Sequence, residues 1–199
     1  QRVLAKHWPH VRRWDDVRTF PPGPKEEWDV DVICGGFPCQ DISDAGKRAG
    51  IGGKQSGLWS EFVRIVRLLR PRYVVVENTA SLAVRGLGRV LGDLSALGFD
   101  AEWSVVSACS LGAPHMRKRL FVVAYPGGGE GLDGQRPWLE LPQGGDPARD
   151  FREVWLQPEP CRVAHGTPRL VDRLAGVGDS VVPQIAELIG RRLLAELLA

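Results

Sequence analysis

The chain has 199 residues, of which 43% are hydrophobic and 25% are charged, and its formal net charge is +2. This length suits one main α/β domain with a core of its own, and the composition excludes a disordered chain. The small net charge also excludes binding to nucleic acid through bulk positive charge alone. Because no apolar run could cross a bilayer and no secretory leader pattern is recognisable, we expect a cytoplasmic protein without a membrane anchor.

Four cysteines are scattered along the chain, at Cys34, Cys39, Cys109 and Cys161. They form no Cys-x-x-Cys pair, and no histidine follows at zinc-finger spacing, so we expect neither a metal site nor a disulfide scaffold. Cys34 and Cys109 lie in apolar, strand-like segments, which predicts that both are buried and inert.

The first predicted elements lead to Cys39. A helix-like segment runs from Val3 to Trp8, and a β-branched run over residues 28–34 predicts a buried strand. Gly35, Gly36 and Pro38 are expected to end this strand abruptly. Cys39 then follows the carboxyl end of the strand, where open α/β sheets hold their chemistry.

The next predicted elements form a βαβ unit. A polar, glycine-rich loop over residues 41–57 precedes a helix predicted from the spacing of apolar residues between Leu58 and Leu69. The apolar run 73–76 then predicts a strand that ends at Glu77. Since the strands of a βαβ unit are parallel, Cys39 and Glu77 are expected on the same rim of the sheet.

The remaining elements complete one sheet and return to it. A helix is predicted over residues 87–97, ending at Gly98, and two strands follow at 101–108 and 120–125, joined by a basic loop. The stretch 126–160 is rich in glycine and proline and has little periodicity. A final amphipathic helix is predicted over residues 185–197.

Four short motifs occur in a fixed order: Gly35-Gly36-Phe37-Pro38-Cys39-Gln40, Glu77-Asn78-Thr79, Gly112-Ala113-Pro114-His115-Met116-Arg117-Lys118-Arg119 and Gly178-Asp179-Ser180-Val181-Val182-Pro183. Together they resemble the motifs of the cytosine-C5 DNA methyltransferases of the prokaryotic and phage type. His115 stands where that family has glutamine, and Asp179 stands where it has asparagine. The resemblance implies a Rossmann-like α/β sheet of the S-adenosylmethionine-dependent methyltransferases.

The resemblance also implies a division of the chain. Residues 1–125 would form a partial catalytic core, and 126–165 a short target-recognition region. Residues 166–199 would return to the core. The family's Phe-x-Gly-x-Gly loop is absent upstream of Cys39, so we expect an N-terminally truncated chain that lacks the first two strands and the helix between them.

The resemblance assigns a chemical role to each catalytic candidate. Cys39 would add as a thiolate to carbon 6 of cytosine, and Glu77 would protonate or share a proton with N3. Arg119 would hold O2 of the base, and Arg117 and Asn78 would support the site. The alternatives are a small buried cysteine at position 39, a structural ion pair at Glu77 and a solvated basic turn for the two arginines.

Further expectations concern the ligands. Double-stranded DNA is the expected partner, and the loop 41–57 would close behind an extruded base, unless it is a plain surface loop. Candidate DNA contacts are Gln40, Ser43 and Lys47. The expected cofactor is S-adenosyl-L-methionine, and by resemblance its candidate contacts are Asp16, Gly36, Pro38, Leu58, Asp179 and Ser180. A missing N-terminal segment or a second chain would complete its site, and we expect a monomer.

Two other functions remain open at this stage. The chain is compatible with a tRNA cytosine-C5 methyltransferase, since one branch of the family acts on RNA and the recognition region is short. It is also compatible with a catalytically incomplete relic that binds DNA or a partner, since the glycine loop is absent.

Overall fold

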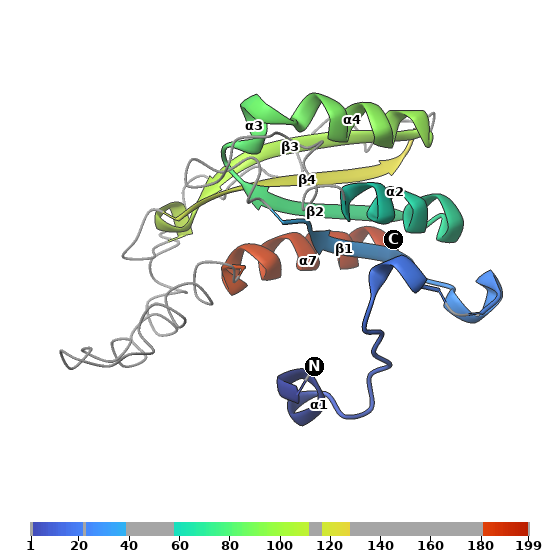
Figure 1. Cartoon of the computed structure of the whole chain (residues 1–199). Coiled ribbons are helices and arrows are strands. Elements are labelled where there is room, and N and C mark those ends of the chain that lie inside the picture. The colour runs from blue at the N-terminus through green and yellow to red at the C-terminus, as the bar shows by residue number, and fades with distance from the viewer. Residues whose placement is uncertain (1, 22, 39–57, 112–116, 128–180, 199) are drawn as a thin grey trace.

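The computed structural model describes residues 2–21, 23–38, 58–111, 117–127 and 181–198. Within these ranges four strands form one sheet in the order β1-β2-β4-β3. Their bounds are β1 Val32–Gly36, β2 Tyr73–Thr79, β3 Phe99–Ser107 and β4 Lys118–Pro126. β1 runs parallel to β2, whereas β4 runs antiparallel to both of its neighbours (Figure 1). The predicted α/β class is confirmed, as are the two parallel strands of the βαβ unit.

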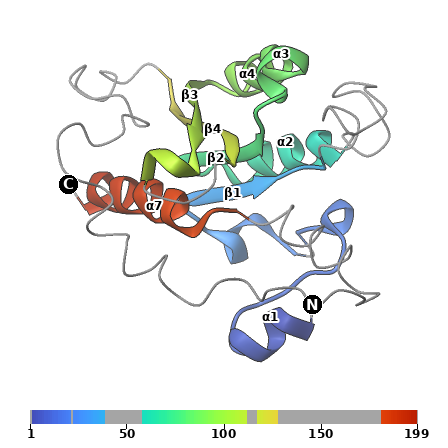
Figure 2. The ribbon, with the colours of Figure 1, turned by 90° about the vertical axis from the view of Figure 1, so that its left-hand side faces the viewer.

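Helices cover the sheet on both faces (Figure 1 and Figure 2). One face carries α2 (Leu58–Leu69), α3 (Leu82–Arg85) and α4 (Leu87–Ala96), and the other carries α7 (Pro183–Leu198). The predicted helices at 58–69, 87–97 and 185–197 are thus confirmed. Gly98 ends the α4 segment with a φ of 83°, a conformation that favours glycine.

The centre of the sheet is apolar because both of its faces are covered. In β2, Val74 and Val76 belong to the core under α2 and α4, whereas Tyr73 and Val75 belong to the core under α7. Alternate side chains of a strand point to opposite faces, so a strand covered on both sides is apolar throughout. This arrangement leaves the polar residues of β2 to its carboxyl end, where the site lies.

The strand predicted at residues 28–34 is partly wrong in position and in burial. Residues Lys25–Trp28 form a 3₁₀ helix, η2, and β1 begins four residues later than Trp28 and includes both glycines. A Cβ at Gly35 would lie 3.0 Å from Cε2 of Phe62 on α2, so this glycine lets the helix approach the strand. β1 is an edge strand of the described sheet, which explains why its residues are only partly buried.

The two cysteines expected in the core are both exposed. Cys34 lies on the edge strand β1, and Cys109 lies in η3 (Ala108–Leu111), the 3₁₀ turn after β3. The prediction of buried, inert thiols is therefore wrong. Its basis was local hydrophobicity, which does not distinguish an edge strand or a turn from a central strand.

The N-terminal part extends away from the sheet. The short helix α1 (Arg2–His7) has no buried residue and lies apart from the strands in Figure 1. The chain then returns, and the 3₁₀ turn η1 (Val17–Thr19) and η2 contact α2. Among the described helices, none is long and apolar enough to cross a membrane.

Candidate active site

The site residues meet at the rim where β1 and β2 end and β4 begins. Gly36 pairs with Glu77 across the parallel ladder, and Thr79 pairs with Arg119 across the antiparallel one. The predicted placement of Glu77 beside the end of β1 is therefore confirmed. The nucleophile candidate Cys39 itself lies outside the described residues, which end at Pro38 on this side of the rim.

Glu77 and Arg119 form an ion pair on the face of the sheet that carries α7. Nε of Arg119 lies 3.1 Å from Oε1 of Glu77, and their side chains are only 16% and 19% exposed, respectively. Removing one partner of such a shielded pair leaves an uncompensated charge, so each residue holds the other in place. An acidic group and a fixed cation side by side can bind the polar edge of a planar ring.

The ion pair between Glu77 and Arg119 is relevant to the alternative stated above, in which Glu77 forms an ion pair with a purely structural role. The two residues that the resemblance assigns to the base are each other's partners. A structural pair and a base-binding pair share this geometry, so the catalytic role of both residues stays a prediction.

Gly36 allows the carboxylate of Glu77 to pass close to β1. A Cβ at Gly36 would lie 3.0 Å from the backbone oxygen of Glu77 and 3.1 Å from its Oε2. Real Cβ atoms rarely approach a backbone oxygen so closely, and the paired strand cannot move aside as a flexible side chain can. The role of Gly36 as a cofactor contact stays a prediction, but the structure gives a separate reason for a glycine here.

Asn78 ties the end of β2 to the segment that leads to Cys39. Its side chain is 3% exposed, Nδ2 donates to the carbonyl of Phe37 at 3.1 Å, and Oδ1 accepts from the backbone N–H of Thr79 at 2.8 Å. Both partners are backbone groups at the rim, one at the last residue of β2 and the other just beyond β1. Asn78, predicted as a catalytic residue, is thus placed to brace the rim.

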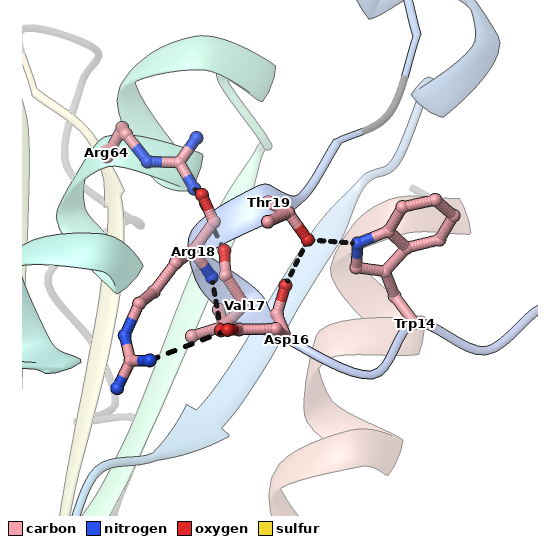
Figure 3. A network of polar contacts seen from close by, with 6 residues as sticks. All are labelled: Trp14, Asp16, Val17, Arg18, Thr19 and Arg64. Atoms are coloured by element: carbon pink, nitrogen blue, oxygen red, sulfur yellow. Dashed lines mark hydrogen bonds and ion pairs between the residues drawn. The ribbon is translucent and has the colours of Figure 1, made fainter.

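Asp16 organises the 3₁₀ turn η1 (Figure 3). Its Oδ1 accepts from the backbone N–H of Arg18 at 3.0 Å, and its carbonyl accepts from Oγ1 of Thr19 at 3.0 Å. Nε1 of Trp14 donates to the same hydroxyl at 2.8 Å. Asp16 is therefore held in an ordered turn, and its role as a cofactor contact stays a prediction.

Arg64 on α2 fastens this turn to the core, and sequence reasoning did not single it out for this purpose. One guanidinium nitrogen donates to the carbonyl of Val17 at 2.9 Å (Figure 3). Nε of the same guanidinium pairs with Glu61 at 2.7 Å. From the sequence alone, an arginine at this position of a helix is interpreted as part of a solvated, charged face. Only the tertiary fold shows that its fork spans two segments.

The structure brings together some of the predicted site residues and leaves others undescribed. Glu77, Asn78, Arg119 and Gly36 meet at one rim, Pro38 continues from β1, and Leu58 begins α2. Arg117 is partly buried and directly precedes β4. The candidates outside the described residues are Cys39, Gln40, Ser43, Lys47, Asp179 and Ser180. Within the described ranges, no group of three or more His, Cys, Asp or Glu side chains could hold a metal ion.

Comparison with known proteins agrees with the motifs. The family model described as C-5 cytosine-specific DNA methylase matches residues 2–131. The type II methyltransferase M.CviJI of Paramecium bursaria Chlorella virus IL3A is 34% identical over 125 residues, 62% of this chain and 34% of that protein. The type II methyltransferase M1.HphI of Haemophilus parahaemolyticus is 36% identical over 107 residues, 51% of this chain and 29% of that protein. The chain thus spans about a third of the length of these curated relatives.

Two solved structures share the fold. A variant of Spodoptera frugiperda DNMT2 aligns with a TM-score of 0.51 and 19% identity, covering 63% of this chain and 39% of that chain. The methyltransferase EhMeth of Entamoeba histolytica aligns with a TM-score of 0.51 and 13% identity, covering 70% of this chain and 42% of that chain. The fold is therefore the Rossmann-like fold of these methyltransferases, and the family match, which extends over more than half of the sequence, shows that the chain belongs to the C-5 cytosine-specific DNA methylases.

Proposed function

We propose that the chain carries the catalytic centre of a DNA cytosine-C5 methyltransferase. The observation that supports this most directly is the shielded pair of Glu77 and Arg119, which lies beside the end of the strand leading into Pro38 and Cys39. A nucleophile, an acid and a fixed cation are the three groups that the chemistry needs.

The reaction requires a nucleophile because carbon 5 of cytosine is by itself too weakly nucleophilic to take a methyl group. The Cys39 thiolate forms a bond to carbon 6, and the ring electrons move toward carbon 5 and N3. Glu77 shares its proton with N3, and Arg119 donates to O2, so the charge that develops on the ring is neutralised. Transfer of the methyl group would release S-adenosyl-L-homocysteine. Water acting as a base then takes the proton from carbon 5, and expulsion of the thiolate restores the aromatic ring.

S-adenosyl-L-methionine is the proposed cofactor, and when bound it supplies the methyl group. The described residues fit part of such a site. Asp16 offers a carboxylate in an ordered turn, and Leu58 offers an apolar side chain at the start of the helix that holds this turn. The space beside Gly36 is filled by Glu77, so a contact there would have to be made by the backbone.

The proposal includes a partner for the open side of the sheet. The outer edge of β1 is unpaired within the described sheet, and an unpaired strand edge is a ready template for another strand. A further segment or a second chain that adds a strand here would complete the cofactor site. We propose action in the cytoplasm, on double-stranded DNA, with candidate contacts from Gln40, Ser43 and Lys47.

The test is intact-mass spectrometry after incubation with S-adenosylmethionine and duplex DNA that contains 5-fluorocytosine, because fluorine at carbon 5 blocks the final elimination and traps the adduct. We expect a methylated covalent complex that maps to Cys39. The variant Cys39→Ser should form none, whereas Cys109→Ser, which removes another exposed thiol, should form it normally. A parallel reaction with tRNA tests the RNA alternative, and the absence of an adduct with either substrate, with or without the remaining polypeptide, would refute the proposal.

A further inference from the structure

The 3₁₀ turn η1 is a very short element in an exposed part of the chain. It closes with hydrogen bonds from the N–H of Thr19 to the carbonyl of Asp16 at 3.1 Å and from the N–H of Phe20 to the carbonyl of Val17 at 3.3 Å. A turn of three residues has little stability of its own, because few hydrogen bonds compensate for the ordering of its backbone. Its shape therefore depends on contacts from other segments.

Arg64 on α2 makes such a contact with the end of the turn (Figure 3). Its Nη2 donates to the carbonyl of Val17 at 2.9 Å and lies 3.5 Å from the carbonyl of Arg18. A cation is favoured at the last carbonyls of a helical turn, because these groups carry partial negative charge. Glu61, one turn earlier on α2, holds Nε of Arg64 at 2.7 Å and so orients the guanidinium toward η1.

The carboxylate that the turn presents is partly open to a ligand. Oδ1 of Asp16 accepts from the backbone N–H of Arg18 at 3.0 Å, whereas Oδ2 lies at 3.5 Å from the guanidinium of Arg18. These two side chains are 48% and 65% exposed, respectively, so the pair is weak and screened by solvent. Val17, the next residue, offers an exposed apolar side chain. A bound molecule can therefore replace solvent at Asp16 and Val17 without breaking the turn.

Helix α2 connects two parts of the proposed cofactor site. Leu58 is its first residue, and Arg64 follows about 9 Å further along the helix axis. The helix is a firm support, because Trp59, Ile65 and other side chains of one face are buried in the core. The bond from Arg64 to η1 thus fixes where Asp16 lies relative to Leu58.

We propose that Arg64 is a positioning residue for S-adenosylmethionine, which acts by holding η1 and its Asp16 in the geometry that binds the cofactor. The inference rests on the proposed function, since Asp16 is the cofactor contact proposed there. It goes beyond that function because it assigns a purpose to an arginine that acts through the turn.

Two measurements distinguish this purpose from a general structural role. NMR follows hydrogen exchange of the backbone N–H groups of Thr19 and Phe20, with Val75 in the central strand β2 as the reference. Calorimetry gives the affinity for S-adenosylmethionine under the conditions in which the unaltered chain forms the methylated adduct, with or without the remaining polypeptide. Arg64→Met removes the donors, Arg64→Lys keeps the charge, and Arg67→Met, at an exposed arginine one turn further along α2, is the matched control.

Arg64→Met should make exchange at Thr19 and Phe20 about tenfold faster and the affinity for S-adenosylmethionine about tenfold lower, with no change at Val75. Loss of a hydrogen bond from a charged donor shifts the closing of the turn by up to about a hundredfold, which leaves the turn open most of the time. Arg64→Lys should change both quantities about threefold, because an ammonium lacks the fork that joins Glu61 to η1. Arg67→Met should leave both within about twofold.

The kinetic signature is a change in KM without a change in kcat. At saturating S-adenosylmethionine, Arg64→Met should transfer the methyl group at a rate within about twofold of the unaltered protein, because bound cofactor closes the turn. A fall in kcat at an unchanged KM would contradict the inference.

Other outcomes would overturn the inference in ways that can be told apart. If Arg64→Met behaves like Arg67→Met, Arg64 does not hold the turn, and the proposed function stands. If exchange becomes faster but the affinity does not fall, η1 is not a cofactor contact. If Val75 exchanges faster by the same factor, Arg64 stabilises the whole domain and positions nothing in particular. If the unaltered protein forms no adduct and binds no S-adenosylmethionine under any of these conditions, the proposed function fails and the inference fails with it.

Discussion

Replacing Asn78 with alanine should destabilise the fold substantially, although the change removes only a small side chain. The substitution removes the hydrogen-bond partner of the carbonyl of Phe37, at a buried site, and that of the N–H of Thr79, at a partly buried one. An unsatisfied buried polar group costs about 1–3 kcal/mol and the partly buried N–H adds less than that, so we expect a loss of about 1–4 kcal/mol. A domain is typically stable by about 5–15 kcal/mol, so this loss is a large fraction of the total.

Urea denaturation followed by tryptophan fluorescence measures this loss as a shift of the midpoint at a constant slope. Asn78→Asp is the informative companion, since it keeps an acceptor for Thr79 but turns a carboxylate oxygen toward the carbonyl of Phe37. At neutral pH it should therefore also be destabilising. Glu187→Ala on α7, whose side chain is 49% exposed, should change the free energy of unfolding by less than about 0.5 kcal/mol.

A loss below about 1 kcal/mol for Asn78→Ala would refute the reasoning, because the buried carbonyl of Phe37 should by itself cost at least that much once it has no partner. Such a result would mean that water reaches the rim or that the end of β1 relaxes away from β2.

Three further predictions follow from single positions. Gly36→Ala should lower the free energy of unfolding by about 1–3 kcal/mol in thermal unfolding, because the new Cβ meets the backbone of Glu77. Gly88→Ala in α4 should raise it by about 0.5–1 kcal/mol, because a Cβ there has nothing within 4 Å. Equal effects of the two substitutions would contradict this prediction. Thr79→Val should leave the free energy of unfolding unchanged or raise it by up to about 1 kcal/mol, because the buried Oγ1 of Thr79 has no hydrogen-bond partner in the described part of the chain. A clear loss of stability in urea denaturation would show that a partner exists. Burial, and then the charge of neighbouring carboxylates, raises the pKa of Tyr125 above 10.0, so the folded state ionises later than the unfolded one. Its contribution to stability is complete below pH 10 and declines as the pH rises through the higher folded pKa, so Tyr125→Phe should flatten the fall in the free energy of unfolding that is measured above pH 10.

The sequence predicts the regular elements well where one pattern governs them. The helix Leu58–Leu69 matches its prediction in both bounds, because its apolar spacing is strong and Pro71 prevents continuation. The start of β1 was mispredicted, because the alternation of Trp28, Asp29, Val30 and Asp31 resembles a strand. In the fold, Trp28 belongs to the 3₁₀ turn η2 that follows Pro24, and tertiary contacts with α2 decide this.

Some features of the site could likewise be predicted from the sequence, and others could not. The placement of Glu77 follows from the βαβ unit, because the topology alone brings the carboxyl ends of β1 and β2 together. The hydrogen bond from Nε1 of Trp59 on α2 to Asp93 on α4 does not follow from any local pattern, since the tryptophan matches an apolar helix face and the aspartate matches a solvated one. A hydrogen-bonded pair whose members are distant in sequence is found only once the fold has placed their two helices on one sheet.

The direction of β4 has a consequence for how such a site can vary. Arg119 enters the rim from the first residues of an antiparallel strand, so its position depends on its register with Thr79 and not on the length of the loop before it. A slip of one residue within the strand would turn Arg119 to the opposite face, toward α4, and leave Glu77 facing a leucine or lysine position instead. The charged pair is thus positioned by backbone pairing within the sheet.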